Sequence, residues 1–479
     1  MTVPSLAFLG FTALVVVLLH LWRDARWRRG VLLAANLAFL ATFSLDPRAW
    51  APFAGLLAFG YLGVRMLQAD RGALRRAFPP LCVGLILVYI WLKRYTIIPD
   101  SLLLQHPYVV VGLSYVFFRV LHLVIDAHDG TLPGKIDPVS YLNFSLNFAS
   151  LVSGPIQRYQ DYHRMERDPP SLGVISAGRA IERIVVGFCK VAVLSVLLHA
   201  VQTEAWGNMV HAVPLLPRVG WGAIVAAAYP LYLYANFSGY TDFVIGAARF
   251  TGIMLPENFD RPFTAENFIN FWSRWHITLS SWLKTYVYSP LLMALARRFP
   301  SRRVEPWLAV LAFFVTFFLV GVWHGRTSAF IVFGILQGGG VAGNKLYQIE
   351  MARRLGRTRY RALCANTAYR AFARGLTFAW FTFTLFWFWS NWQQMGVYAH
   401  RLGGTGLALV SIVVLLGATA LLHGVELVRR YGAMLVLDGD PLFASRYVRT
   451  VWCTALLIVS VSVTTLLNLP APDIVYRAF

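Results

Sequence analysis

The stretch that decides the fold runs from Trp307 to Tyr347 and has the sequence WLAVLAFFVTFFLVGVWHGRTSAFIVFGILQGGGVAGNKLY. It is apolar on both sides of one polar interruption, Trp323-His324-Gly325-Arg326. Because about 20 apolar residues span a bilayer, the pattern predicts two membrane helices that form a hairpin and turn at this interruption. Gly325 would permit the turn. The hairpin places His324 at its outer end, or at mid-depth if the helices are tilted or broken.

The composition is that of a membrane protein. Of 479 residues, 57% are hydrophobic and only 14% are charged, whereas a soluble domain carries nearer a quarter charged residues. We predict an all-α polytopic membrane protein with about eleven to thirteen transmembrane or re-entrant helices. The apolar segments are 4–22, 31–45, 50–67, 78–92, 107–125, 180–201, 219–249, 305–323, 327–347, 375–392, 404–424 and 450–468. A break is expected in 219–249 around Pro230, and residues 139–153 are predicted to form a re-entrant or broken helix.

The net charge of +21 comes from basic clusters in short linkers between apolar runs, such as 23–29, 71–76, 297–303 and 353–361. This is the positive-inside pattern, which makes anionic membrane lipids the partner and excludes nucleic acid. The clusters place the linkers in the cytoplasm and the N-terminus outside. Four dispersed cysteines predict no metal site and no disulfide framework.

A second histidine lies in the polar-aromatic segment Phe271–Ser280, FWSRWHITLS. If this segment is helical, Arg274 and His276 point to different sides, and one side could hold a phosphate while the other holds the imidazole. Ionisable groups at bilayer depth usually face a cavity or a proton-handling site. Imidazole is also the side chain best suited to act as a general base near neutral pH. The two histidines therefore indicate an enzyme that works inside the membrane.

Five ordered blocks carry a family resemblance. They are Ser114–Phe118, Ser153–Tyr159, Pro256–Phe259, Phe271–Ser280 and Trp323–Gly325. In these blocks the chain resembles the membrane-bound O-acyltransferases, in the branch of the alginate O-acetylation membrane protein and the teichoic-acid D-alanyl transferase. The resemblance covers residues 112–345 of a single predicted transmembrane domain, 1–479, with flanking helices in 1–111 and 346–479.

The resemblance implies a ring of tilted helices around a tunnel, with an acyl thioester entering from the cytoplasm and an acceptor hydroxyl from outside. The family's catalytic histidine carries over to His324, and its second histidine, with a supporting role, to His276. The expected substrate-binding residues are Asn258, Arg274, Trp323, Arg326 and Arg158. For Arg158 and Arg274 a role in setting topology alone stays open.

The expected activity is an O-acetyltransferase-like acyl transfer with no tightly bound cofactor and no metal. The donor is acyl-CoA, with acetyl-CoA expected, or an acyl carrier protein, and the acceptor is an extracytoplasmic polysaccharide or a periplasmic acyltransferase. Direct transfer is favoured over an acyl-enzyme on a serine such as Ser280. The branch indicates a bacterial inner membrane.

Several alternatives stay open. Residues 290–294, PLLMA, depart from the Gly-Gly continuation of alginate-type members, so the acceptor could instead be a lipid or a protein. A secondary transporter that uses His276, His324 and Arg326 as a proton or substrate site is the rival from another class.

Overall fold

The computed structural model describes residues 1–22, 24–69, 72, 76–437, 440–442 and 444–467. The basic clusters predicted at 23–29 and 71–76 lie partly outside these residues. The regular secondary structure of the described residues is helical apart from one two-stranded sheet, in which β1 (Val436–Leu437) pairs antiparallel with β2 (Asp440–Pro441). The prediction of an all-α fold is thus confirmed.

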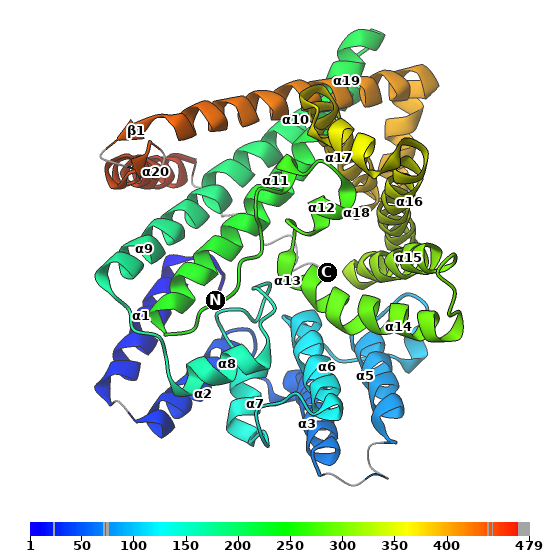
Figure 1. Ribbon diagram of the computed structural model, residues 1–479. Helices are drawn as coiled ribbons and strands as arrows, with labels where there is room; N and C mark the ends of the chain where they lie inside the picture. Colours follow the sequence, from blue (N-terminus) through cyan, green and yellow to red (C-terminus); the bar gives the residue numbers. More distant parts are fainter. Residues whose placement is uncertain (23, 70–71, 73–75, 438–439, 443, 468–479) are drawn as a thin grey trace. The chain divides into compact units, whose positions relative to one another are not determined.

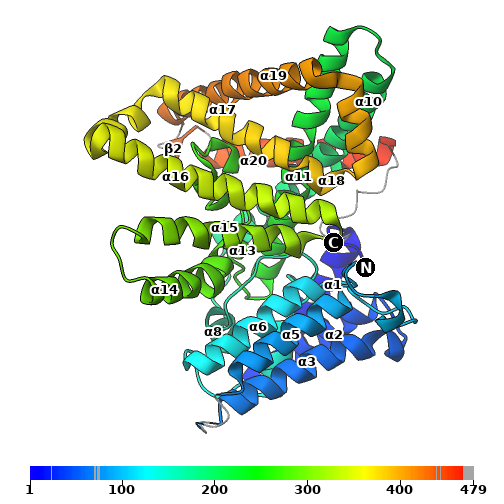
Figure 2. The same cartoon turned by 90° about the vertical axis from the view of Figure 1, so that its right-hand side faces the viewer.

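The contacts divide the described residues into two compact units, 1–188 with 239–257 and 189–238 with 258–467. The described part of the first unit holds eight α-helices and one short 3-10 helix, labelled in Figure 1 where there is room: α1 (Leu6–Leu21), α2 (Ala25–Ala41), α3 (Pro47–Leu67), α5 (Phe78–Leu92), η1 (Asp100–Leu102), α6 (Leu113–Asp129), α7 (Pro138–Ser145), α8 (Tyr159–Arg167) and α9 (Val174–Cys189). Helices α3, α5 and α6 pack side by side (Figure 2).

The second unit contains the rest of the described chain. Its elements are η2 (Lys190–Ser195), α10 (Val196–His211), η3 (Pro262–Thr264), α12 (Phe268–Trp272), α13 (Ile277–Leu283), η4 (Lys284–Tyr288), α14 (Ser289–Arg298), α15 (Glu305–His324), α16 (Ser328–Ala365), α17 (Thr367–Thr384), α18 (Phe386–Trp389), α19 (Trp392–Met434) and α20 (Arg446–Leu467). Of these, η2 and η4 are π-helices. Helix α11 (Leu215–Phe250) contributes to both units.

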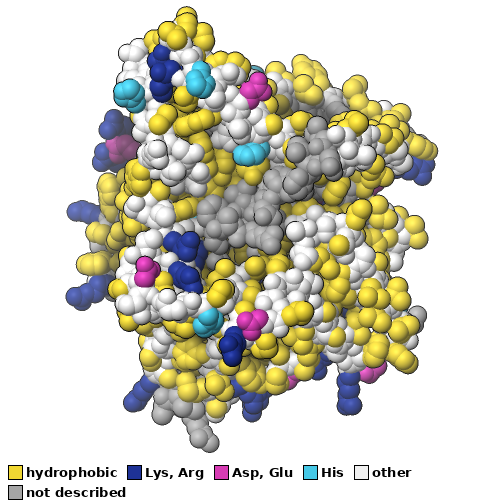
Figure 3. All heavy atoms as spheres, turned by 180° about the vertical axis from the view of Figure 1, so that it is seen from behind, with side chains coloured by type: hydrophobic (Ala, Val, Ile, Leu, Met, Phe, Trp, Pro, Cys, Tyr) yellow, Lys and Arg dark blue, Asp and Glu magenta, His cyan; other side chains and the backbone are white. Residues whose placement is uncertain are grey.

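Five helical stretches in the described residues are long and apolar enough to cross a membrane: Pro47–Leu67, Val174–His211, Glu305–His324, Trp392–Met434 and Arg446–Leu466. Two shorter helices, Leu6–Leu21 and Phe78–Leu92, are also apolar. Hydrophobic side chains predominate on the face drawn in Figure 3. An exposed hydrophobic surface of this kind is stable in contact with lipid and unstable in water.

The hairpin predicted around Trp323 is present, because α15 ends at His324 and α16 begins at Ser328. The two helices run side by side (Figure 2). Small residues allow this close approach: a Cβ added to Gly321 would lie 2.1 Å from the Cα of Gly334. A Cβ at Gly334 would itself lie 2.6 Å from the carbonyl oxygen of Phe318. Contact between backbones through small residues is typical of helix packing in membranes.

Two details of the helix prediction need correction. The break expected near Pro230 is absent, and α11 continues through this proline. The apolar run that starts at 107 becomes helical only at Leu113, because Gly112 takes a left-handed conformation with φ of 72° against the carbonyl of Leu151. Only glycine adopts this conformation readily.

The predicted broken helix in 139–153 is short in the structure: α7 ends at Ser145, and buried turns follow. Arg119, which is 1% exposed, donates to the carbonyl oxygens of Ser145 (3.0 Å) and Ser150 (2.8 Å). The fully buried carboxylate of Glu166 accepts from Ser140 Oγ (2.7 Å) and Asn143 Nδ2 (2.9 Å). The bonds from Arg119 supply partners that non-helical backbone needs inside a membrane protein, whereas Glu166 binds side chains of α7.

Candidate active site

His276 lies at a sharp turn between α12 and α13. Its backbone is left-handed, with φ of 47° and ψ of 52°. A non-glycine residue in this region costs about 1–3 kcal/mol and persists only where the surroundings hold it. Residues 273–276 are not helical, so the condition under which Arg274 and His276 were expected to point to different sides of a helix is not met.

The turn is held by the Pro-bounded segment that precedes α12. Phe259 and Trp275 form an antiparallel bridge. The amide of Asp260 donates to the carbonyl of Arg274 at 3.0 Å, and the amide of Ile277 donates to the carbonyl of Asn258 at 3.0 Å. These pairings fix the backbone on both sides of His276.

The side chain of Asn258 completes this support. Asn258 and His276 are both fully buried. The Oδ1 atom of Asn258 accepts from the amide (3.2 Å) and the hydroxyl (2.9 Å) of Thr278, and it lies 3.2 Å from Nδ1 of His276. Because the Thr278 amide can only donate, the Asn258 atom that faces it must be the carbonyl oxygen. His276 Nδ1 therefore carries the hydrogen, and Nε2 keeps its lone pair.

Burial also sets the charge of His276. Removal from water disfavours imidazolium and lowers the pKa of His276 from 6.5 to about 3. Aromatic rings of Phe237 and Trp323 lie around the imidazole, at centroid distances of 4.9 and 6.5 Å. His276 is accordingly neutral at physiological pH and can accept a hydrogen bond through Nε2.

His324 stands at the C-terminal end of α15 and is 3% exposed. Its ring contacts those of Trp323 (4.7 Å), Phe388 (5.2 Å) and Phe333 (6.0 Å). Trp323 is therefore a ring neighbour of both histidines. The structure thus brings together four of the predicted site residues, listed here: Asn258, His276, Trp323 and His324.

The three predicted arginines lie in other settings. Arg274 binds within its own loop, where Nε donates to Asn270 Oδ1 at 3.0 Å and a terminal nitrogen lies 3.5 Å from Asp260 Oδ2. Arg326 is exposed in the turn after His324. Arg158 is exposed at the start of α8, in the other unit.

Two ion pairs of Glu266 anchor the loop that leads to α12. The sequence did not indicate them. Glu266 accepts from Arg370 Nε at 2.6 Å and from Arg374 at 3.1 Å. Arg374 is only 5% exposed and also donates to the carbonyl of Thr264. Glu266 is more than 100 positions from either arginine in the sequence, so no local motif indicates the contact. The one available signal is that Arg370 and Arg374, four residues apart, share one face of α17.

Ser280, the serine named as an alternative nucleophile, bonds to backbone. Its hydroxyl donates to the carbonyl oxygen of Trp275 at 3.4 Å. Among the described residues, no group of three or more His, Cys, Asp and Glu side chains could hold a metal ion. The buried imidazole pair is the arrangement in the second unit with clear capacity for proton transfer.

The comparisons with known proteins bear on this site. A sequence profile of the membrane-bound O-acyltransferase (MBOAT) family matches residues 127–388, which is more than half of the chain. The chain belongs to the MBOAT family. The matched region includes both histidines, Asn258 and the arginines that bind Glu266.

Individual MBOAT relatives are similar over much of the chain. The chain is 30% identical to the teichoic acid D-alanyltransferase of Bacillus subtilis over 47% of its length and 56% of that relative. It is 27% identical to the probable alginate O-acetylase AlgI of Pseudomonas aeruginosa over 74% of its length and 68% of that relative. The chain thus spans little more than half of the first relative and about two thirds of the second. The predicted family and its branch are confirmed.

Proposed function

We propose that the chain is an O-acyltransferase that moves an acyl group, with acetyl expected, from a thioester donor to a hydroxyl acceptor at the cell envelope. The observation that supports this most directly is the pair of buried histidines, each next to Trp323. A buried base next to a neutral hydrogen-bonding imidazole suits removal of a hydroxyl proton. The names of the relatives point to polysaccharide or teichoic acid as acceptors.

His324 is the proposed general base. As its ring nitrogen takes the hydroxyl proton, the acceptor oxygen attacks the thioester carbon and a C–O bond forms. The tetrahedral intermediate then collapses, the C–S bond breaks, and His324 returns the proton to the departing sulfur. This scheme needs no acyl-enzyme and no metal.

His276 has a different proposed role. Because its pKa is far below neutrality, it is a weak base and does not compete with His324 for the proton. Because the one proton of the attacking hydroxyl goes to His324, the Nε2 of His276 can instead accept a hydrogen bond from another donor of the bound substrates and so help to orient them. Trp323, next to both rings, closes the site against water.

The remaining expectations form part of the same proposal. Arg326 and Arg158, both exposed, are proposed to contact the substrates. Arg274 is proposed to stabilise the loop that carries His276 and also to contact substrate. The donor is acetyl-CoA or an acylated carrier protein. The acceptor is an extracytoplasmic polysaccharide or a periplasmic acyltransferase. The protein is proposed to lie in a bacterial inner membrane, and residues 1–479 are proposed to form one catalytic domain.

The first test is acyl transfer by the purified chain in nanodiscs, with radiolabelled acetyl-CoA in one arm and an acetylated carrier protein in the other. His324→Ala should lower the rate by about 10²–10⁴-fold, the usual contribution of a general base. His400→Ala, at an exposed histidine on α19, serves as the control and should keep full activity. Full activity in a folded His324→Ala variant would refute the proposed mechanism.

A further inference from the structure

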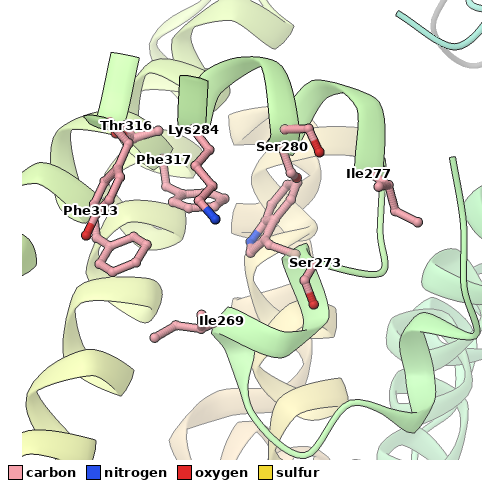
Figure 4. Close-up of a pocket in the computed structure, with 11 residues that line it drawn as sticks. Ile269, Ser273, Ile277, Ser280, Lys284, Phe313, Thr316 and Phe317 are labelled. Carbon is pink, nitrogen blue, oxygen red and sulfur yellow. The ribbon is translucent and has the colours of Figure 1, made fainter. Parts of the chain in front are cut away.

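A pocket of about 280 Å³ lies in the second unit, next to α13. Eleven residues from α12, α13, η4, α15 and the turn at Ser273 line it (Figure 4): Ile269, Trp272, Ser273, Ile277, Ser280, Ser281, Lys284, Tyr288, Phe313, Thr316 and Phe317. No part of the proposed reaction uses it.

One wall of the pocket belongs to a candidate membrane span. Phe313, Thr316 and Phe317 follow one another along α15, within Glu305–His324. The hydroxyl of Thr316 donates to the carbonyl of Ala312 at 2.7 Å, so this wall presents mainly rings and methyl groups. Such a wall suits a hydrocarbon chain.

The pocket also carries a cation. Lys284 is the one charged side chain among the eleven, and its ammonium group extends from η4 toward the pocket (Figure 4). Two acidic residues that precede it in the sequence bond elsewhere: Asp260 with Arg274, and Glu266 with Arg370 and Arg374. Lys284 is exposed, so its charge is available to an anionic ligand that enters the pocket.

Hydrogen-bond donors accompany the lysine. Ser281 and Tyr288 bring hydroxyl groups to the same pocket. Trp272 is 3% exposed, and its indole Nε1 has no hydrogen-bond partner within the described structure. The pocket therefore combines one positive charge and several polar hydrogens with a long apolar wall.

We propose that this pocket binds a phosphate ester with an apolar arm, and that the ester is a membrane phospholipid. Lys284 and Ser281 hold the phosphate, the Trp272 indole donates to an ester carbonyl, and one acyl chain lies along Phe313 and Phe317. A lipid fits better than free phosphate, because free phosphate would leave the wall on the membrane span uncovered.

Occupancy has a consequence for the neighbouring site. Ile277 and Ser280 belong to α13, which begins directly after His276. A ligand held between α13 and α15 restrains the element that carries this histidine. The lipid is thus a structural ligand, and its binding does not depend on the proposed transfer reaction.

The test measures binding of tritiated phosphatidylglycerol to the full chain in detergent. Lys284→Gln should weaken saturable binding about tenfold, as expected when one charge-assisted bond to phosphate is lost. Lys345→Gln removes the same charge from α16, away from the pocket lining, and should bind as the unchanged protein does. Equal binding by Lys284→Gln and Lys345→Gln would overturn the proposal.

Two further arms identify the ligand. Ser281→Phe fills the pocket from an exposed position and should abolish saturable binding while leaving the thermal midpoint unchanged. Diacylglycerol, inorganic phosphate and coenzyme A serve as competitors, and none should displace the lipid as well as unlabelled phosphatidylglycerol does. Displacement by coenzyme A at equal concentration would assign the pocket to a soluble thioester and refute the lipid assignment.

Discussion

At the scale of single residues, the arrangement around His276 links backbone strain to protonation. The left-handed turn at this residue directs Nδ1 to the carbonyl oxygen of Asn258. That oxygen is in turn held by the amide and hydroxyl of Thr278. The tautomer of a buried histidine is set by the bond that its other nitrogen makes. Asn258 is predicted as a substrate contact, and from these bonds we propose that it also positions His276.

This assignment predicts opposite behaviour for two substitutions of Asn258. Asn258→Ala removes the acceptor and should lower kcat about 10- to 100-fold with little change in KM, since a buried hydrogen bond of this kind contributes about 1–3 kcal/mol. Asn258→Asp keeps the acceptor and adds a negative charge, which raises the pKa of His276. Its pH–rate profile should shift upward, whereas Asn258→Ala should show no such shift. A rise in KM alone in both variants would restore the substrate-binding role.

Acid stability gives a second prediction. Unfolded His276 takes up a proton near pH 6.5, whereas the folded residue does so only near pH 3. Between these values the unfolded state binds more protons, so this residue destabilises the fold by up to about 1.4 kcal/mol per pH unit as the pH falls. The thermal midpoint of His276→Gln in detergent should therefore fall less steeply than that of the unchanged protein between pH 6.5 and 4. Identical slopes would contradict a buried neutral His276.

The sequence predicted the identity of these residues better than their geometry. Trp323 and both histidines follow from motifs, and the structure brings them together. The left-handed turn was not predictable, because the segment FWSRWHITLS contains no glycine, the residue that adopts this conformation most readily. What stops the helix is the pairing with 258–260, a contact between segments that no local pattern shows.

At the scale of elements, the α15–α16 hairpin explains why the chain needs glycine at particular positions. Gly321 and Gly334 bring the two backbones into contact. The apolar pattern alone predicted the two helices and the turn at His324. It did not predict which glycines face the partner helix, since α16 carries several glycines within two turns.

A matched pair of substitutions on α16 tests this packing. Gly334→Ala places its Cβ 2.6 Å from the carbonyl oxygen of Phe318 and should destabilise the protein by about 1–3 kcal/mol through overpacking. Gly339→Ala meets nothing within 4 Å and should stabilise it by up to about 1 kcal/mol through helix propensity. Thermal midpoints of both variants in the same detergent measure the difference. Equal midpoints would mean that the helices are not in contact at Gly334.

At the scale of the whole molecule, the charge pattern sets the predicted orientation in the membrane. The basic residues 353–361 lie toward the C-terminal end of α16, and Arg326 lies just before its N-terminal end. The positive-inside rule places the arginine-rich end in the cytoplasm. The two ends of one helix then face opposite sides of the bilayer.

Cysteine labelling tests this orientation. Cys364 follows the basic run and is partly exposed, whereas Arg326→Cys would put a thiol in the turn after His324. In single-cysteine variants, a membrane-impermeant maleimide should label Arg326→Cys in intact cells and Cys364 only after lysis. Labelling of Cys364 in intact cells would invert the predicted topology.

Helix α16 also contains one non-helical residue, Gly356, with φ of 76° and ψ of 154°. From Ser328 to the residue before this kink the helix rises about 42 Å, which exceeds the hydrocarbon core of about 30 Å. The kink lets the arginines beyond it turn along the membrane surface. The length of the helix before the kink then sets the distance between that surface and the turn at His324. Adding or removing one helical turn before Gly356 would move the histidine by about 5.4 Å, which is further than a proton can be passed.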